Sequence, residues 1–168
     1  MMRPLLVIIF ISAIALAQGR KQSGNPNIDM SYHLEMARAA AAHRANRLVS
    51  EEEFIRMSKG PNTIVLDARS REKYDEMHVK GAINLSFPDI DIASLERLIP
   101  NKETRILIYC NNNFRGAERP FPAKLPAAAL NLSTYTTLYI YGYRNVYELE
   151  PLIEIGKSKL EFEGTLVR

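Results

Sequence analysis

Residues 105–116 read RILIYCNNNFRG, a strand-like run that ends in the only cysteine of the chain. From Ile106 to Tyr109 the residues are aliphatic or aromatic without a break, which is typical of a strand buried on both faces of a sheet. Ligands of α/β proteins bind beyond the carboxyl ends of such strands. Cys110 is therefore a candidate functional thiol. The alternative is a cysteine buried only for packing, since one cysteine cannot close a disulfide within the chain.

The segments around this run alternate between strand and helix patterns. Residues 63–68 (TIVLDA) are a second candidate for a buried strand, with an apolar run at 64–66, and residues 145–149 (NVYEL) are a third strand candidate. Helices are predicted over residues 29–46, 50–59, 70–76, 90–99 and 135–143. Strands that alternate with helices in this way predict an α/β domain built on a parallel sheet.

The first residues of the chain have the pattern of a secretory signal peptide. Arg3 precedes an apolar run that ends in the small-residue motif Ala15-Leu16-Ala17. The run is shorter than the roughly 20 residues that span a bilayer, so an uncleaved anchor is the weaker alternative. We predict a signal peptide over residues 1–17, a linker and helix over 18–46, and the main domain over 47–168. The mature protein is expected to be periplasmic or secreted, without a stable membrane anchor.

Length, charge and histidine spacing exclude several classes of function. The chain has 168 residues, enough for one domain. Its net charge of +3 comes from basic residues spread among almost as many acidic ones, whereas nucleic-acid binding requires them to cluster. His33 and His43 lie on one predicted helix without the i, i+4 spacing of a metal site. We predict no nucleic-acid partner, no metal and no organic cofactor.

Three segments together resemble the rhodanese-like domain superfamily. They are VLDARSREKYDEMHVKGAINLSF (65–87), ILIYCNNNFRG (106–116) and LYIYGYRNVYELEPLIEI (138–155), in the order and spacing of that family. The resemblance implies an α/β fold, with a rhodanese-like parallel sheet flanked by helices. The predicted helix before residue 47 is then an extra N-terminal helix.

The resemblance also implies a sulfurtransferase. Cys110 would carry sulfur as a persulfide, taken from a small anionic donor such as thiosulfate and passed to a thiol, a protein or a cyanide-like acceptor. Arg115 would be the second catalytic residue and bind the anion. The intervening loop would bind substrate through Asn111, Asn112, Asn113 and Phe114. Three further matching residues are expected to be structural, namely Asp67, Arg69 and His78.

Two other functions remain open at this point. A non-catalytic module could use the same fold to bind a partner or to sense sulfur species. A transferase predicts a lowered pKa of the Cys110 thiol, because nearby positive charge favours the thiolate, whereas a module predicts a near-ordinary one. Related cysteine phosphatases have five residues between cysteine and arginine, but only four separate Cys110 from Arg115, which favours sulfur over phosphorus.

The sequence departs from the family pattern at two places. Asn113 stands where glycine is usual, and asparagine tolerates a left-handed backbone better than most residues. Residues 116–134 look like an insertion whose prolines prevent a regular helix. The insertion could be a lid, with Phe121 and Lys124 shaping acceptor specificity. It could instead replace the helix N-terminus that normally stabilises negative charge at the site, and so leave a weakened or inactive site.

Overall fold

The computed structural model describes residues 24–167. The central sheet has five strands in the order β1-β7-β5-β2-β4, all parallel. The five are β1 (Leu48–Val49), β2 (Thr63–Asp67), β4 (Ile83–Asn84), β5 (Arg105–Tyr109) and β7 (Val146–Leu149). β5 lies between β7 and β2, so Cys110 follows the middle strand of the sheet. The predicted α/β fold with a parallel sheet is confirmed.

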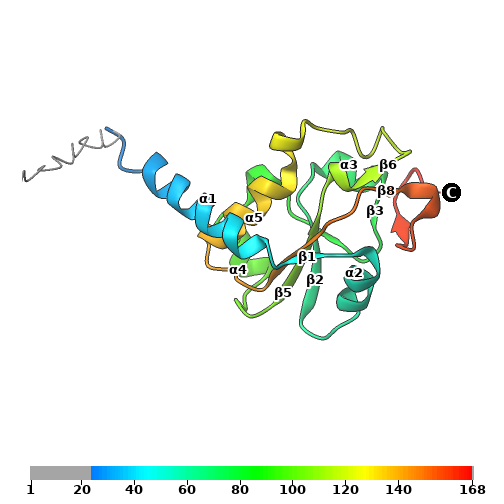
Figure 1. Cartoon of the computed structure of the whole chain (residues 1–168), viewed down its shortest axis with the longest axis horizontal. Helices are drawn as coiled ribbons and strands as arrows, with labels where there is room; N and C mark the ends of the chain where they lie inside the picture. The colour runs from blue at the N-terminus through cyan, green and yellow to red at the C-terminus, as the bar shows by residue number, and fades with distance from the viewer. Residues whose placement is uncertain (1–23, 168) are drawn as a thin grey trace, which may run out of the picture. The chain divides into compact units, whose positions relative to one another are not determined.

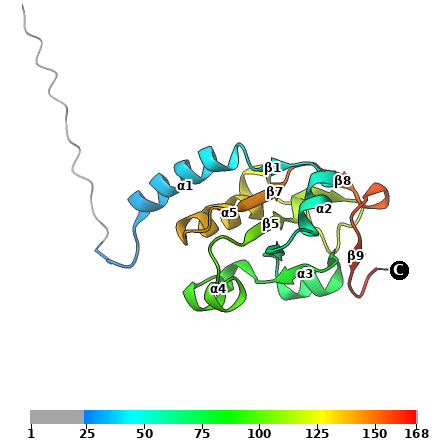
Figure 2. The same ribbon diagram turned by 90° about the horizontal axis from the view of Figure 1, so that it is seen from below.

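Helices cover both faces of this sheet (Figures 1 and 2). One face packs against α1 (Met30–Arg44), α4 (Ile92–Leu98) and α5 (Leu130–Ile140), and the other against α2 (Glu51–Ser58) and α3 (Arg71–Glu76). Alternate residues of β5 serve the two cores, with Ile106 and Ile108 in the first and Leu107 and Tyr109 in the second. This two-sided burial explains the unbroken apolar run in the sequence.

Shorter elements complete the described chain. They are the strands β3 (His78–Val79), β6 (Phe114–Arg115), β8 (Ile153–Glu154) and β9 (Phe162–Glu163), and the 3-10 helices η1 (Phe87–Asp89), η2 (Asn111–Asn113), η3 (Pro126–Ala128) and η4 (Ile155–Lys157). β3 pairs antiparallel with β9, and β6 pairs parallel with β8. None of the helices within residues 24–167 is long and apolar enough to cross a membrane. The predicted signal peptide lies outside the described residues.

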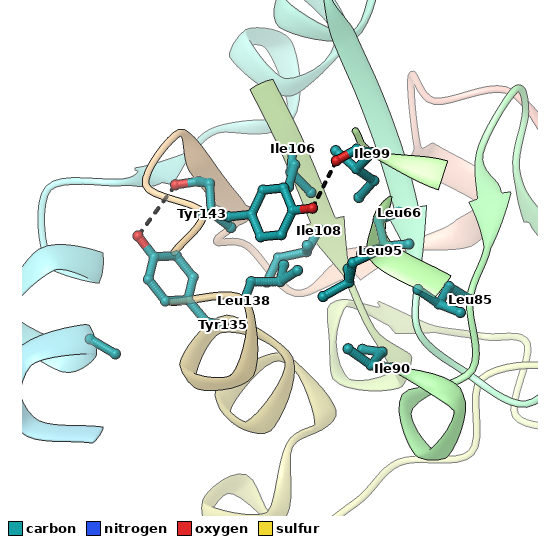
Figure 3. Packing of buried hydrophobic residues seen from close by; sticks show 12 residues of the cluster. Leu66, Leu85, Ile90, Leu95, Ile99, Ile106, Ile108, Tyr135, Leu138 and Tyr143 are labelled. Atoms are coloured by element: carbon teal, nitrogen blue, oxygen red, sulfur yellow. Dashed lines mark hydrogen bonds between the residues drawn. The ribbon is translucent and has the colours of Figure 1, made fainter. Parts of the chain in front are cut away.

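The extra N-terminal helix α1 is attached to the domain through α5 and the sheet. Ala40 of α1 is buried in the first core, beside Tyr135 and Leu138 of α5. The Tyr135 hydroxyl donates to the carbonyl of Val146 (Figure 3) and lies 2.8 Å from Nδ1 of His43. The C-terminal end of α1 is therefore fixed above β7, close to where β5 ends.

Asp67, Arg69 and His78, in the segment 65–87 that resembles the rhodanese-like family, make structural contacts, as expected. Asp67 and Arg69 form a buried ion pair, and the Tyr109 hydroxyl donates to Asp67 Oδ2 over 2.6 Å. His78 stacks on Tyr74 with ring centroids 3.6 Å apart. These contacts join the carboxyl ends of β2 and β5 to the loops that follow them.

Candidate active site at Cys110

Cys110 lies at the carboxyl end of β5, on the wall of a cavity of about 220 Å³. Its residue surface is only 2% exposed, so the thiol is largely shielded from solvent. The cavity is lined by residues from α1, the Cys110 loop, the start of α5 and the end of β7, namely Arg44, Cys110, Asn112, Asn113, Pro126, Ala129, Asn131, Leu132, Glu148 and Glu150.

Asn113 holds the loop after Cys110 in place from inside the protein. Its side-chain oxygen accepts from the backbone N–H of Cys110 at 2.8 Å, and its amide donates to the carbonyl of Leu149 at 2.7 Å. The expectation of a left-handed backbone here is wrong, because among the described residues other than glycine only Asn62 has a positive φ. In place of backbone freedom, Asn113 supplies two buried side-chain hydrogen bonds.

The other two asparagines tie the inserted segment to the loop. Asn111 donates to the carbonyl of Pro122 at 2.8 Å. Asn112 donates to the carbonyl of Lys124 at 2.8 Å and accepts from its N–H at 3.0 Å. The three consecutive asparagines therefore fasten the Cys110 loop to two different parts of the chain.

The insertion brings a helix N-terminus back to the cysteine. After η3 the chain enters α5 at Leu130, five residues earlier than the sequence predicts. The backbone N–H groups of Leu130 and Asn131 interact with the Cys110 thiol, and the Asn131 side chain donates to Asn113 Oδ1 at 3.2 Å. The idea that the insertion removes the helix N-terminus is therefore wrong.

Burial governs the acidity of the thiol. It raises the pKa of Cys110, and the backbone N–H groups of Asn131, Asn112 and Leu130 offset this only in part. The nearby Glu148 carboxylate also raises the pKa, since it repels a thiolate. The lowered thiol pKa that the sequence predicts for a transferase is not found, because burial raises the pKa of Cys110.

A pH profile of thiol alkylation will report this raised pKa. Below its pKa a thiol has a thiolate fraction that rises tenfold per pH unit, so the alkylation rate should climb past the ordinary cysteine pKa of about 8.5 before it levels off. The measurement is the rate of iodoacetamide addition to Cys110 between pH 6 and 10. Free cysteine serves as the reference. If the rate for Cys110 levelled off at a lower pH than the rate for free cysteine, the burial argument would be contradicted.

The remaining predicted site residues do not face Cys110. Arg115 is in β6, with its side chain 64% exposed, and its Nε lies 2.9 Å from Glu154 Oε2. Phe114 is buried in the second core against Phe121. Phe121 is itself 2% exposed and cannot shape an acceptor site as predicted. The structure brings only Asn112 and Asn113 of the predicted set to the cavity with Cys110.

Sequence reasoning missed the charged pair at the cavity, Arg44 and Glu148. Arg44 at the end of α1 donates from Nε and Nη2 to the two carboxylate oxygens of Glu148, at 2.5 and 2.6 Å. The hydrogen bond with Glu148 raises the pKa of Arg44. A glutamate within a predicted buried strand was the available signal, because a buried carboxylate requires a cationic partner.

Comparisons with known proteins identify the family and the fold. The sequence matches the family model of the rhodanese-like domain over residues 50–151. Among solved structures, a protein from Bacillus halodurans is 26% identical, with a TM-score of 0.52 over 79% of this chain and 88% of that chain. The rhodanese-like domain of an Anabaena protein is 18% identical, with a TM-score of 0.51 over 71% and 80%. No curated protein matches the sequence significantly. Because the family model covers more than half of the sequence, the chain belongs to the rhodanese-like domain family.

Proposed function

We propose that this protein is an exported sulfurtransferase that carries sulfane sulfur as a persulfide on Cys110. One observation carries the proposal: backbone N–H groups of Asn112, Leu130 and Asn131 surround a thiol that opens onto a cavity. Such donors stabilise an anion without a side-chain charge. A thiolate, a persulfide anion and an approaching anionic donor all need this stabilisation.

The reaction would split one sulfur transfer into two displacements on the same atom. The Cys110 thiolate attacks the outer sulfur of thiosulfate, the S–S bond of the donor breaks, and sulfite leaves with the bonding electron pair. Cys110 then holds one extra sulfur as a persulfide anion. A nucleophilic acceptor such as cyanide or a thiolate attacks that outer sulfur, and the Cys110 thiolate is released unchanged.

A non-catalytic or sulfur-sensing module is the second candidate. The raised pKa of Cys110 favours it, because at neutral pH a smaller fraction of the thiol is present as the nucleophilic thiolate. We do not propose a phosphatase. That chemistry requires a loop arginine facing the cysteine, and Arg115 pairs with Glu154.

Intact mass tests the proposal directly. The protein is incubated with thiosulfate at pH 9, where more of the thiol is ionised, beside a Cys110→Ala control. We expect the wild type to gain the mass of one sulfur atom, to lose it on addition of cyanide, and the control to gain nothing. If a thiol that still alkylates gains no sulfur from thiosulfate or from polysulfide, the module becomes the better description.

The intact mass of the protein also tests whether it is exported with cleavage of a signal peptide. Residues 1–17 have the composition of a signal peptide, which supports a periplasmic or secreted mature protein. Protein recovered from the producing cells should have the mass of a chain that begins at Gln18. A mass that retains residues 1–17 would contradict cleavage at this site.

A further inference from the structure

The Cys110 cavity has one cationic side chain among the described residues that line it, and it comes from outside the span matched by the family model. Arg44 belongs to α1, whereas the match begins at residue 50. The other charged groups on the wall are the carboxylates of Glu148 and Glu150. An anionic sulfur donor that enters this cavity therefore meets a single positive group.

The contacts of Arg44 leave part of its guanidinium available. The group has five N–H donors in a planar fork, and the salt bridge to Glu148 uses the Nε and Nη2 side of that fork. The side chain is 28% exposed, whereas that of Glu148 is 6% exposed. Glu148 thus holds the Nε and Nη2 edge of the guanidinium, while the Arg44 side chain lines the cavity.

The salt bridge also fixes the position of this charge. Held by both carboxylate oxygens, the guanidinium keeps its plane and direction, which is the arrangement that binds oxyanions with two parallel hydrogen bonds. The neighbouring contact of His43 with Tyr135 fixes the same turn of α1. The charge is therefore held in place before any ligand arrives.

We propose that Arg44, held by Glu148, is the residue that binds the anionic group of the donor beside Cys110, in the place of the loop arginine Arg115. This inference rests on the proposed function for the identity of the donor, a small sulfur oxyanion such as thiosulfate. It makes the extra N-terminal helix part of the active site and assigns Arg44 as a determinant of donor specificity.

The charge preference of alkylation tests Arg44 without any sulfur transfer. The same thiolate attacks iodoacetate and iodoacetamide and displaces iodide from each, so the ratio of the two rates cancels any change in the pKa of Cys110 and reports the preference for an anion. The probe variant is Arg44→Met/Glu148→Leu, because apolar residues of similar size replace a buried ion pair with little loss of stability. The matched control is Arg115→Met.

Loss of the Glu148 carboxylate alone would raise the iodoacetate-to-iodoacetamide ratio, so a fall in the double variant is attributable to Arg44. We expect a fall of up to about tenfold, the size expected for one charged hydrogen bond, and no change in the control. An unchanged ratio in a folded double variant, or an equal fall in the control, would overturn the proposal. If the double variant does not fold, Arg44→Lys is tested in its place, with Arg115→Lys as the control. The iodoacetate-to-iodoacetamide ratio is then expected to fall in Arg44→Lys and to stay unchanged in Arg115→Lys.

These experiments can refute sulfur transfer by Cys110 and anion binding by Arg44 independently of each other. A wild-type protein that loads no sulfur, but whose ratio still falls with the loss of Arg44, would refute sulfur transfer and leave the anion site standing. Normal loading from thiosulfate, with the same KM in the wild type and the double variant, would leave sulfur transfer standing and refute the role of Arg44.

Discussion

Replacing Arg69 with methionine will lower the free energy of unfolding by about 3–5 kcal/mol, because it leaves the Asp67 carboxylate buried without its cation. Asp67 is fully buried and Arg69 is 2% exposed. Arg69 Nη2 lies 2.5 Å from Asp67 Oδ2. Methionine replaces the unbranched aliphatic part of the arginine side chain but supplies none of its hydrogen bonds. Urea unfolding of the two proteins, followed by circular dichroism, measures the difference.

The loss should extend beyond the ion pair itself. Arg69 also donates to the carbonyl of Pro120 at 2.8 Å and to that of Met77 at 2.7 Å. One side chain therefore joins the end of β2, the turn before β3 and the inserted segment. Limited proteolysis should cut residues 116–129 sooner in the Arg69→Met variant than in the wild type.

An exposed ion pair provides the matched control. Arg56 pairs with Glu53 on the surface of α2, with 72% of the Arg56 side chain exposed, and such pairs contribute little to stability. Arg56→Met should leave the unfolding midpoint almost unchanged. If Arg69→Met changed stability as little as Arg56→Met does, the buried network would not be a main support of the fold.

The sheet and the place of the cysteine could be predicted because their signals are local. β2 and β5 contain the unbroken apolar runs 64–66 and 106–109, and these residues pack into the cores on both faces of the sheet. A residue directly after such a strand lies at its carboxyl edge whatever the rest of the chain does. The position of Cys110 therefore followed from six consecutive residues.

The charges around the cysteine could not be predicted because their pairing is long-range. Arg44 and Glu148 are 104 residues apart in the sequence, and Arg115 is drawn away from Cys110 by the pairing of β6 with β8. Spacing within one segment carries no information about either contact. The start of α5 was missed for a related reason, since prolines in the insertion concealed where the helix begins.

Asn113 is the position where a change should affect the site most. In Asn113→Ala the N–H of Cys110 and the carbonyl of Leu149 lose their buried partners, and each unsatisfied group costs about 1–3 kcal/mol. The loop would also no longer hold the N–H of Asn112 against the thiol. We expect the rate of persulfide loading from thiosulfate to fall about 10- to 100-fold. Intact-protein mass spectrometry of samples quenched at a series of times measures this rate.

Two further variants separate the side chain of Asn113 from its backbone. Asn112→Ala removes hydrogen bonds that lie at the exposed surface, where water can replace them, and should change loading far less. Asn113→Gly restores the residue that is usual in the family but supplies no hydrogen bonds. Because the backbone of Asn113 is not left-handed, the freedom of glycine brings no advantage here, and Asn113→Gly should be as slow as Asn113→Ala. Full activity of the glycine variant would show that the loop keeps its shape without these bonds, and that the asparagine is only tolerated.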